Sequence, residues 1–173
     1  MVAINQMKND REYENIVHHI LNNEDFKKME LIKHHDSNRL DHSLKVSYYA
    51  YRVAKKLRLD YVQTARGGLL HDFFLERTVD YKKFTDKLKL YTYKHPKDAV
   101  EMSKQHFDIT PMEEDMIRSH MFPFDVSIPR YAESWIVNLV DTGVSIVEFG
   151  KKFGYKLSYA MNLYLILLLN SLR

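Results

Sequence analysis

The 173-residue chain contains no cysteine. It therefore cannot form disulfide bonds or thiolate metal sites, and a metal ion must be held by imidazole and carboxylate groups. Glycine and proline are scarce, at five and four residues, and no linker or internal repeat divides the chain. With 45% hydrophobic residues, a chain of this length can build one core. We expect one domain and a reducing, cytoplasmic setting.

Long hydrophobic runs and a strong charge excess are also missing. The N-terminal residues contain no apolar segment of signal-peptide length, and the most apolar run, residues 160–169, is interrupted by Asn162 and Tyr164. The net charge is only +3, with basic residues scattered among acidic ones. The sequence predicts no membrane span and gives no strong signal of nucleic-acid binding.

Helical periodicity dominates the chain, and no strand pattern is visible. Apolar spacing and caps predict helices over residues 11–22, 24–34, 41–58, 60–73, 95–107, 111–120, 131–149 and 155–172. Residues 35–38 should form a turn, and residues 74–94 a surface crossover with at most one short helix. The last helix is expected to pack along the core or to form a subunit contact. The predicted fold is an all-α, single-domain helical bundle.

Local signals support several of these boundaries. Asp60 is a plausible N-cap, and Thr110 and Glu113 have the spacing of a capping box. Gly67 and Gly68 should allow a neighbouring helix to approach closely, and Gly150 is expected to end the helix over 131–149. The aromatic residues Tyr48, Tyr49, Tyr51 and Trp135 are interpreted as core rather than as a stacking surface for a base.

Histidines and aspartates occur in a set order along these helices. A single His lies on one helix, a His-Asp pair ends the next, two more histidines lie at helix boundaries, and an Asp lies on a late helix; these are His42, His71, Asp72, His95, His120 and Asp141. An aspartate within an apolar helix is costly to bury unless a cation or a donor compensates its charge. Asp141 therefore needs a partner.

These residues resemble the HD superfamily of metal-dependent phosphohydrolases. The resemblance rests on Leu40-Asp41-His42-Ser43, Gly67-Gly68-Leu69-Leu70-His71-Asp72 and Val140-Asp141-Thr142. Further motifs are similar to the extra histidines of the two-metal branch, which has the pattern H...HD...H...H...D and includes symmetrical dinucleoside tetraphosphatases; they are Lys94-His95-Pro96 and Ser119-His120-Met121-Phe122-Pro123. The resemblance spans roughly residues 38–145.

The resemblance implies one HD-type domain over residues 1–173, with N-terminal helices in 1–37, a metal-binding core in 38–145 and C-terminal helices in 146–173. It implies a first divalent ion on His42, His71, Asp72 and Asp141. A second ion would lie on Asp72, His95 and His120, so that Asp72 is shared. Iron or manganese is expected, with zinc, nickel, cobalt or magnesium as alternatives.

The implied activity is hydrolysis of a phosphoester or phosphoanhydride of a nucleotide or another small phosphorylated metabolite by a metal-bound hydroxide. His71 and Asp72 would lie at the catalytic centre, because adjacent side chains at a helix end point in different directions and a carboxylate can bridge two ions. Arg39, Lys45 and Lys94, near the proposed ligands in sequence, are candidate phosphate contacts. The expected partner is the small substrate, and a homodimer is left open.

Alternatives remain beside this interpretation. One is a di-iron oxygenase of the same fold, because the same ligand set in the superfamily can activate dioxygen. The other is a noncatalytic nucleotide-sensing module, which the complete ligand set argues against. The segment Phe73-Phe74-Leu75-Glu76 lacks the acidic pair of the superfamily's guanosine-tetraphosphate hydrolases, and no Gly-Tyr-Pro signature of the cyclic-di-GMP branch follows. The remaining histidines are interpreted as non-ligands, namely His18, His19, His34, His35 and His106.

Overall fold

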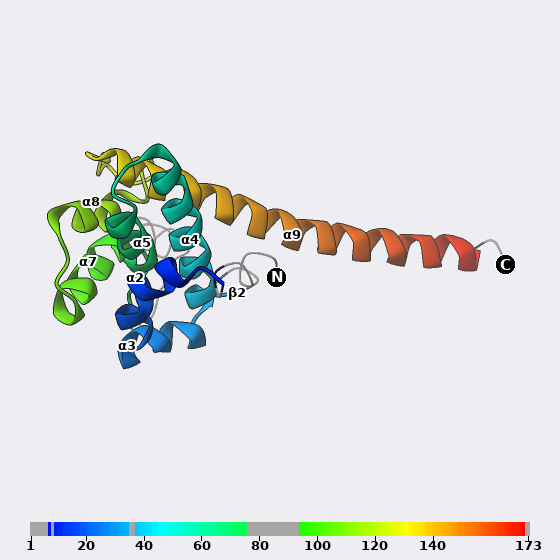
Figure 1. Cartoon of the computed structure of the whole chain (residues 1–173). Helices are drawn as coiled ribbons and strands as arrows, with labels where there is room; N and C mark the ends of the chain where they lie inside the picture. The colour runs from blue at the N-terminus through cyan, green and yellow to red at the C-terminus, as the bar shows by residue number, and fades with distance from the viewer. Residues whose placement is uncertain (1–6, 8, 35–36, 76–93, 172–173) are drawn as a thin grey trace.

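The computed structural model describes residues 7, 9–34, 37–75 and 94–171, and beyond residue 150 its backbone alone is described. The helices are α2 Arg11–Leu21, α3 Glu24–Lys27, α4 Arg39–Leu57, α5 Tyr61–Leu70, α7 His95–His106, α8 Pro111–Ser119 and α9 Ala132–Ser171, with a 3₁₀ helix, η1, at Lys28–Leu31 (Figure 1). The predicted all-α class is confirmed. The crossover predicted for 74–94 falls almost entirely outside the described residues.

The helices pack around α5. Helix α4 packs against α5 and α9, and α8 packs against α5, α7 and α9. Helix α2 also packs against α5 (Figure 1). The larger hydrophobic cluster includes Tyr13, Phe26, Leu69 and Phe73, all essentially inaccessible to solvent. A smaller cluster, which includes Met116, joins α4, α8 and the first part of α9.

The two glycines of α5 lie where neighbouring helices come closest. A β-carbon on Gly68 would be 3.1 Å from the Cα atom of Ser47 in α4, and one on Gly67 would collide with Met116 of α8. The predicted close approach is confirmed, and it brings α4, α5 and α8 together. The predicted caps are confirmed as well: the side chain of Asp60 accepts from the backbone N–H of Gln63, and Thr110 and Glu113 form a capping box.

The region predicted as a helix over 24–34 is divided into three pieces. Phe26 of α3 and Met29 of η1 are both fully buried and lie three residues apart, and the tighter 3₁₀ turn of η1 keeps both side chains on the inner face. The chain then reverses through β1 Lys33–His34 and β2 Ser37–Asn38, which pair antiparallel. Strands of two residues are too short to produce an alternating pattern, so the sequence could not reveal them.

The predicted stop at Gly150 is wrong, because α9 runs without a break from Ala132 to Ser171. No described glycine has a positive φ, so Gly150 does not form the left-handed cap that ends many helices. The predicted packing of residues 155–172 along the core is also not observed, since the C-terminal part of α9 extends away from the bundle (Figure 1). A subunit contact there stays a prediction. Among the described residues, no helix combines the length and hydropathy that a membrane span requires.

The core interpretation of the aromatic residues holds for two of the four. Tyr48 and Tyr51 are buried, whereas Tyr49 and Trp135 are 40% and 39% exposed. Tyr48 and Tyr49 are neighbours on a helix and therefore point about 100° apart, so one face cannot bury both. Trp135 is partly covered by Phe122, whose ring centroid lies 5.5 Å from its own.

Candidate metal centre

The six predicted ligands converge in the middle of the bundle, and all of them are buried. They come from α4, from the turn after α5, from the start of α7, from the end of α8 and from α9; they are His42, His71, Asp72, His95, His120 and Asp141. These positions are spread over 100 residues of sequence. They become neighbours because α4 and α8 pack against α5, α9 packs against α4 and α8, and α7 packs against α8.

Local signals in the sequence place several of these residues. The side chain of Asn38 accepts from the backbone N–H of Asp41 at 2.7 Å and starts α4, which puts His42 within its first turns. Pro96 lies in the first turn of α7, which begins at His95, so His95 is at the N-terminus of the helix. At the end of α8, Asn138 of α9 donates to the backbone carbonyl of His120 at 2.6 Å, which ties the histidine's backbone to α9.

The first group of ligands lies between α4, α5 and α9. Nε2 of His42 is 2.9 Å from Oδ1 of Asp141, and Nε2 of His71 is 3.7 Å from the same oxygen. Nε2 of His71 is also 3.9 Å from Oδ2 of Asp72. His42, His71 and Asp72 each offer a ligand atom within 4.8 Å of the others, as a bound metal ion requires.

The second group lies on the other side of Asp72. The Nε2 atoms of His95 and His120 are 2.9 Å apart, and they are 3.5 and 3.7 Å from Oδ1 of Asp72. Asp72 thus turns one oxygen toward His71 and the other toward His95 and His120. A carboxylate in this orientation can be shared by two ions.

Backbone carbonyls fix the orientation of two of the imidazoles. Nδ1 of His71 donates to the carbonyl of Gly68 and Nδ1 of His120 to that of Ile117, both at 2.8 Å. Because a carbonyl can only accept, Nδ1 carries the proton, and in the neutral ring Nε2 keeps a lone pair directed into the cluster. Nε2 of His71 is buried and has no hydrogen-bond partner among the described residues.

Burial controls the charge of these imidazoles. It lowers the pKa of His71, and together with the nearby His120 it lowers the pKa of His95 to about 3. Both rings are therefore neutral at pH 7, the form that binds metals. Burial also opposes charge on His42, but hydrogen bonds to Asp141 and Glu148 raise its pKa to about 10. In the metal-free protein His42 thus carries a proton that an ion at Nε2 must displace.

The donor set fits divalent transition metals. Neutral imidazole nitrogens and carboxylate oxygens suit iron, manganese, nickel, cobalt and zinc. Two ligands at right angles, each about 2.1 Å from one ion, are about 3 Å apart, which matches the 2.9 Å separations of His42 from Asp141 and of His95 from His120. The buried Nε2 of His71, which faces two carboxylates instead of a donor, also calls for a cation.

Sequence reasoning missed Glu148, which lies on α9 beside the cluster and is buried. Its Oε2 is 3.1 Å from Nδ1 of His42, and its Oε1 accepts from Lys45 at 2.6 Å. Burial raises the pKa of Glu148, but the bonds from His42 and Lys45 outweigh it and lower the pKa to about 2. The available signal was spacing, because Glu148 follows Asp141 by two helical turns and shares its face.

The three candidate phosphate contacts have different surroundings. Arg39 is fully buried, and its guanidinium lies 3.8 Å from the centre of the Phe74 ring and donates to the Phe74 carbonyl at 2.7 Å. Lys45 is ion-paired with Glu148. Lys94 is partly exposed and lies next to His95 at the start of α7. Contact with phosphate stays a prediction for all three.

Three of the histidines interpreted as non-ligands have described side chains, and these lie in neither group. His18 contacts Asn22, His19 contacts Arg66 at 2.7 Å, and His106 is 3.6 Å from Asp25. His35 and the side chain of His34 fall outside the described residues.

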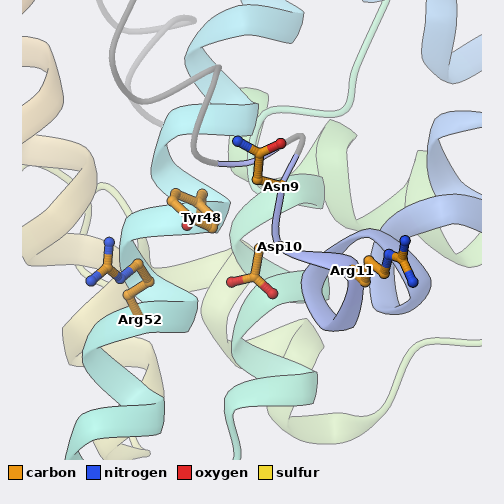
Figure 2. Close-up of a pocket in the computed structure, with 5 residues that line it drawn as sticks. All are labelled: Asn9, Asp10, Arg11, Tyr48 and Arg52. Carbon is orange, nitrogen blue, oxygen red and sulfur yellow. The ribbon is translucent and has the colours of Figure 1, made fainter.

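A surface cavity of about 580 Å³ lies elsewhere, between the start of α2 and the outer face of α4 (Figure 2). It is lined by Asn9, Asp10, Arg11, Tyr48 and Arg52, and none of the six predicted ligands contributes to it. In Figure 2 the guanidinium of Arg11 points away from Arg52, so the two cations do not converge on one point. The ligand cluster is therefore the stronger candidate for chemistry.

Comparison with known families gives one match. A family model described as HD domain matches residues 39–143 of the chain, a range that contains all six predicted ligands. No match was found among curated proteins or among solved structures.

Proposed function

The chain belongs to the HD domain family, and we propose that it is a metal-dependent phosphohydrolase that cleaves a phosphoester or phosphoanhydride bond of a nucleotide or another small phosphorylated metabolite. One observation carries the proposal: two buried groups of His and Asp side chains meet at Asp72, whose two oxygens face different groups. Such an arrangement suits a pair of ions on one carboxylate.

In this proposal His42, His71, Asp72 and Asp141 hold one ion, and Asp72, His95 and His120 hold the second. Divalent ions in such a pair lower the pKa of bound water and neutralise charge on phosphate oxygens. The protein supplies the rigid frame. The carbonyls of Gly68 and Ile117 hold His71 and His120 with their Nε2 lone pairs inward, so little reorganisation is needed when ligands bind.

Positive side chains near the ligands favour an anionic substrate. Lys94 precedes His95 and is partly exposed, so we assign it a direct contact with phosphate. Arg39 and Lys45 are engaged inside the protein, by Phe74 and Glu148 respectively. In the proposal they contribute mainly through the field of their charges, which adds to the attraction for phosphate.

A phosphate-release screen tests the proposal. Purified protein, stripped of metal with a chelator and reloaded with Mn²⁺ or Fe²⁺, is incubated with nucleoside mono-, di- and triphosphates and dinucleoside polyphosphates. We expect metal-dependent release from at least one class of substrate. His71→Ala and Asp72→Ala should abolish phosphate release. Glu133→Gln should retain it; Glu133 lies on α9, is buried, and accepts a hydrogen bond from the backbone of Asp60 at the start of α5.

Two results would refute the assignment. One is equal phosphate release from wild type and from both ligand variants, which would indicate a contaminating phosphatase. The other is oxygen consumption by the iron-loaded protein without any phosphate release, which would favour the di-iron oxygenase alternative.

A further inference from the structure

We propose that Glu148 is a positioning residue of the metal centre, which holds His42 in the orientation and tautomer that a metal ligand needs. Because this role depends on the metal-dependent function proposed above, its test must separate the two. Glu148 lies outside the residues matched by the family model, which end at residue 143.

The geometry places His42 between two carboxylates of the same helix. Asp141 and Glu148 are seven residues apart on α9, about two turns, and so lie on one face. Nε2 of His42 meets Oδ1 of Asp141 at 2.9 Å, and Nδ1 meets Oε2 of Glu148 at 3.1 Å. The nitrogen that faces the ligand cluster is therefore Nε2, and the nitrogen that faces away from it is held by Glu148.

Glu148 does for His42 what a backbone carbonyl does for His71 and His120. In those two residues Nδ1 donates to the carbonyl three residues earlier, at 2.8 Å. In His42 the acceptor is a carboxylate instead. An ionised carboxylate accepts only, so it requires the proton on Nδ1 and leaves Nε2 to bind an ion. Its negative charge also makes the imidazole a stronger ligand than a neutral acceptor would.

Lys45 completes the arrangement. Its ammonium group donates to Oε1 of Glu148 at 2.6 Å, while Oε2 bonds to His42. Both oxygens of this buried carboxylate are thus engaged, which fixes its rotamer and compensates its charge. Lys45 and His42 lie three residues apart on α4, so one turn of α4 presents both donors to Glu148.

The competing interpretation is that Glu148 and Lys45 form an ion pair that only fastens α9 to α4. That interpretation predicts a loss of thermal stability and unchanged metal affinity. A positioning role predicts that metal affinity is the quantity that falls, because loss of a carboxylate that orients a ligating histidine typically weakens metal binding about 10–100-fold.

The experiment measures Mn²⁺ affinity from the electron paramagnetic resonance signal of free Mn²⁺, together with the melting temperature of the metal-free protein. We expect Glu148→Ala to weaken binding about 10–100-fold. Glu148→Gln keeps an acceptor oxygen without the charge and should show a smaller loss. The matched control is Glu133→Gln, because Glu133 is also buried on α9 and also accepts a hydrogen bond, from the backbone of Asp60; its affinity should equal that of wild type.

The outcomes separate the two proposals. If wild type binds Mn²⁺ and Glu148→Ala and Glu148→Gln bind it as tightly, the positioning role is overturned while the proposed function stands. Equal losses in the Glu148 variants and in Glu133→Gln would overturn it as well, since the effect would then be general. If wild type itself binds no divalent metal, both proposals fail.

Discussion

Removal of His95 tests whether the cluster is one site or two. His95 belongs to the second group alone, at 2.9 Å from His120 and 3.5 Å from Asp72, and the first group shares only Asp72 with it. His95→Ala should therefore abolish binding of one ion and preserve the other. Asp72→Ala removes a ligand from both groups and should abolish both.

The size of the effect follows from binding linkage. With free metal at about 100 times the dissociation constant, each ion stabilises the folded state by about 2.7 kcal/mol, so two ions contribute about 5.4 kcal/mol. A domain of this size gains about 2–4 °C in Tm per kcal/mol. The metal-induced rise in Tm should therefore be about 11–22 °C for wild type and about 5–11 °C for His95→Ala, with almost none for Asp72→Ala.

The assay pairs differential scanning calorimetry, with and without Mn²⁺, with elemental analysis after gel filtration. Each variant is compared with its own metal-free form, so changes in the packing of the apo protein cancel. We expect two ions per chain for wild type and one for His95→Ala. Retention of two ions, with an undiminished rise in Tm, would refute the division into two groups that share Asp72.

Three further predictions concern the framework of the site. Burial raises the pKa of Tyr13 above its usual 10.0, so the stability that the neutral side chain contributes is present below pH 10 and is lost as the pH rises above it. Tyr13→Phe removes the hydrogen bond to Ser47 and should cost about 1 kcal/mol at pH 7, and in urea titrations it should flatten the loss of stability above pH 10. Parallel pH profiles of wild type and variant would contradict this. Gly68→Ala should destabilise the protein by about 1–3 kcal/mol, because the added carbon meets the backbone of Ser47, and a higher Tm would show that α4 can move. Thr110→Ala breaks the capping box with Glu113 and should lower the free energy of unfolding by about 1 kcal/mol, as measured by urea denaturation; an unchanged midpoint would rule out a role for the cap.

The sequence was sufficient for the parts of the fold that depend on local signals. Asp60, Thr110 and Pro111 marked the starts of α5 and α8, because a cap or a fixed φ acts within one turn. Gly150 was misleading because a glycine ends a helix only if it adopts a positive φ, and the residue type does not determine φ. The short strands after η1 depend on how the chain turns into α4, which is a tertiary matter.

The candidate site shows a similar division. The positions of His42, His71 and Asp141 could be anticipated from motif order, and the structure brings them together. The spacing of Glu148 from Asp141 was not enough to identify it, since a glutamate near the end of a predicted helix is usually exposed. Its significance appears only when α9 is packed against α4, which places it beside Nδ1 of His42. The internal partners of Arg39 and Lys45 are likewise visible only after folding.

The most direct measurement is anomalous X-ray diffraction from crystals of the Mn²⁺-loaded protein, recorded at the manganese absorption edge. We expect two anomalous peaks about 3.5–4 Å apart, on either side of Asp72. One peak should lie near His42, His71 and Asp141, and the other near His95 and His120. Peaks only at the protein surface, with this cluster lacking anomalous density, would contradict this expectation.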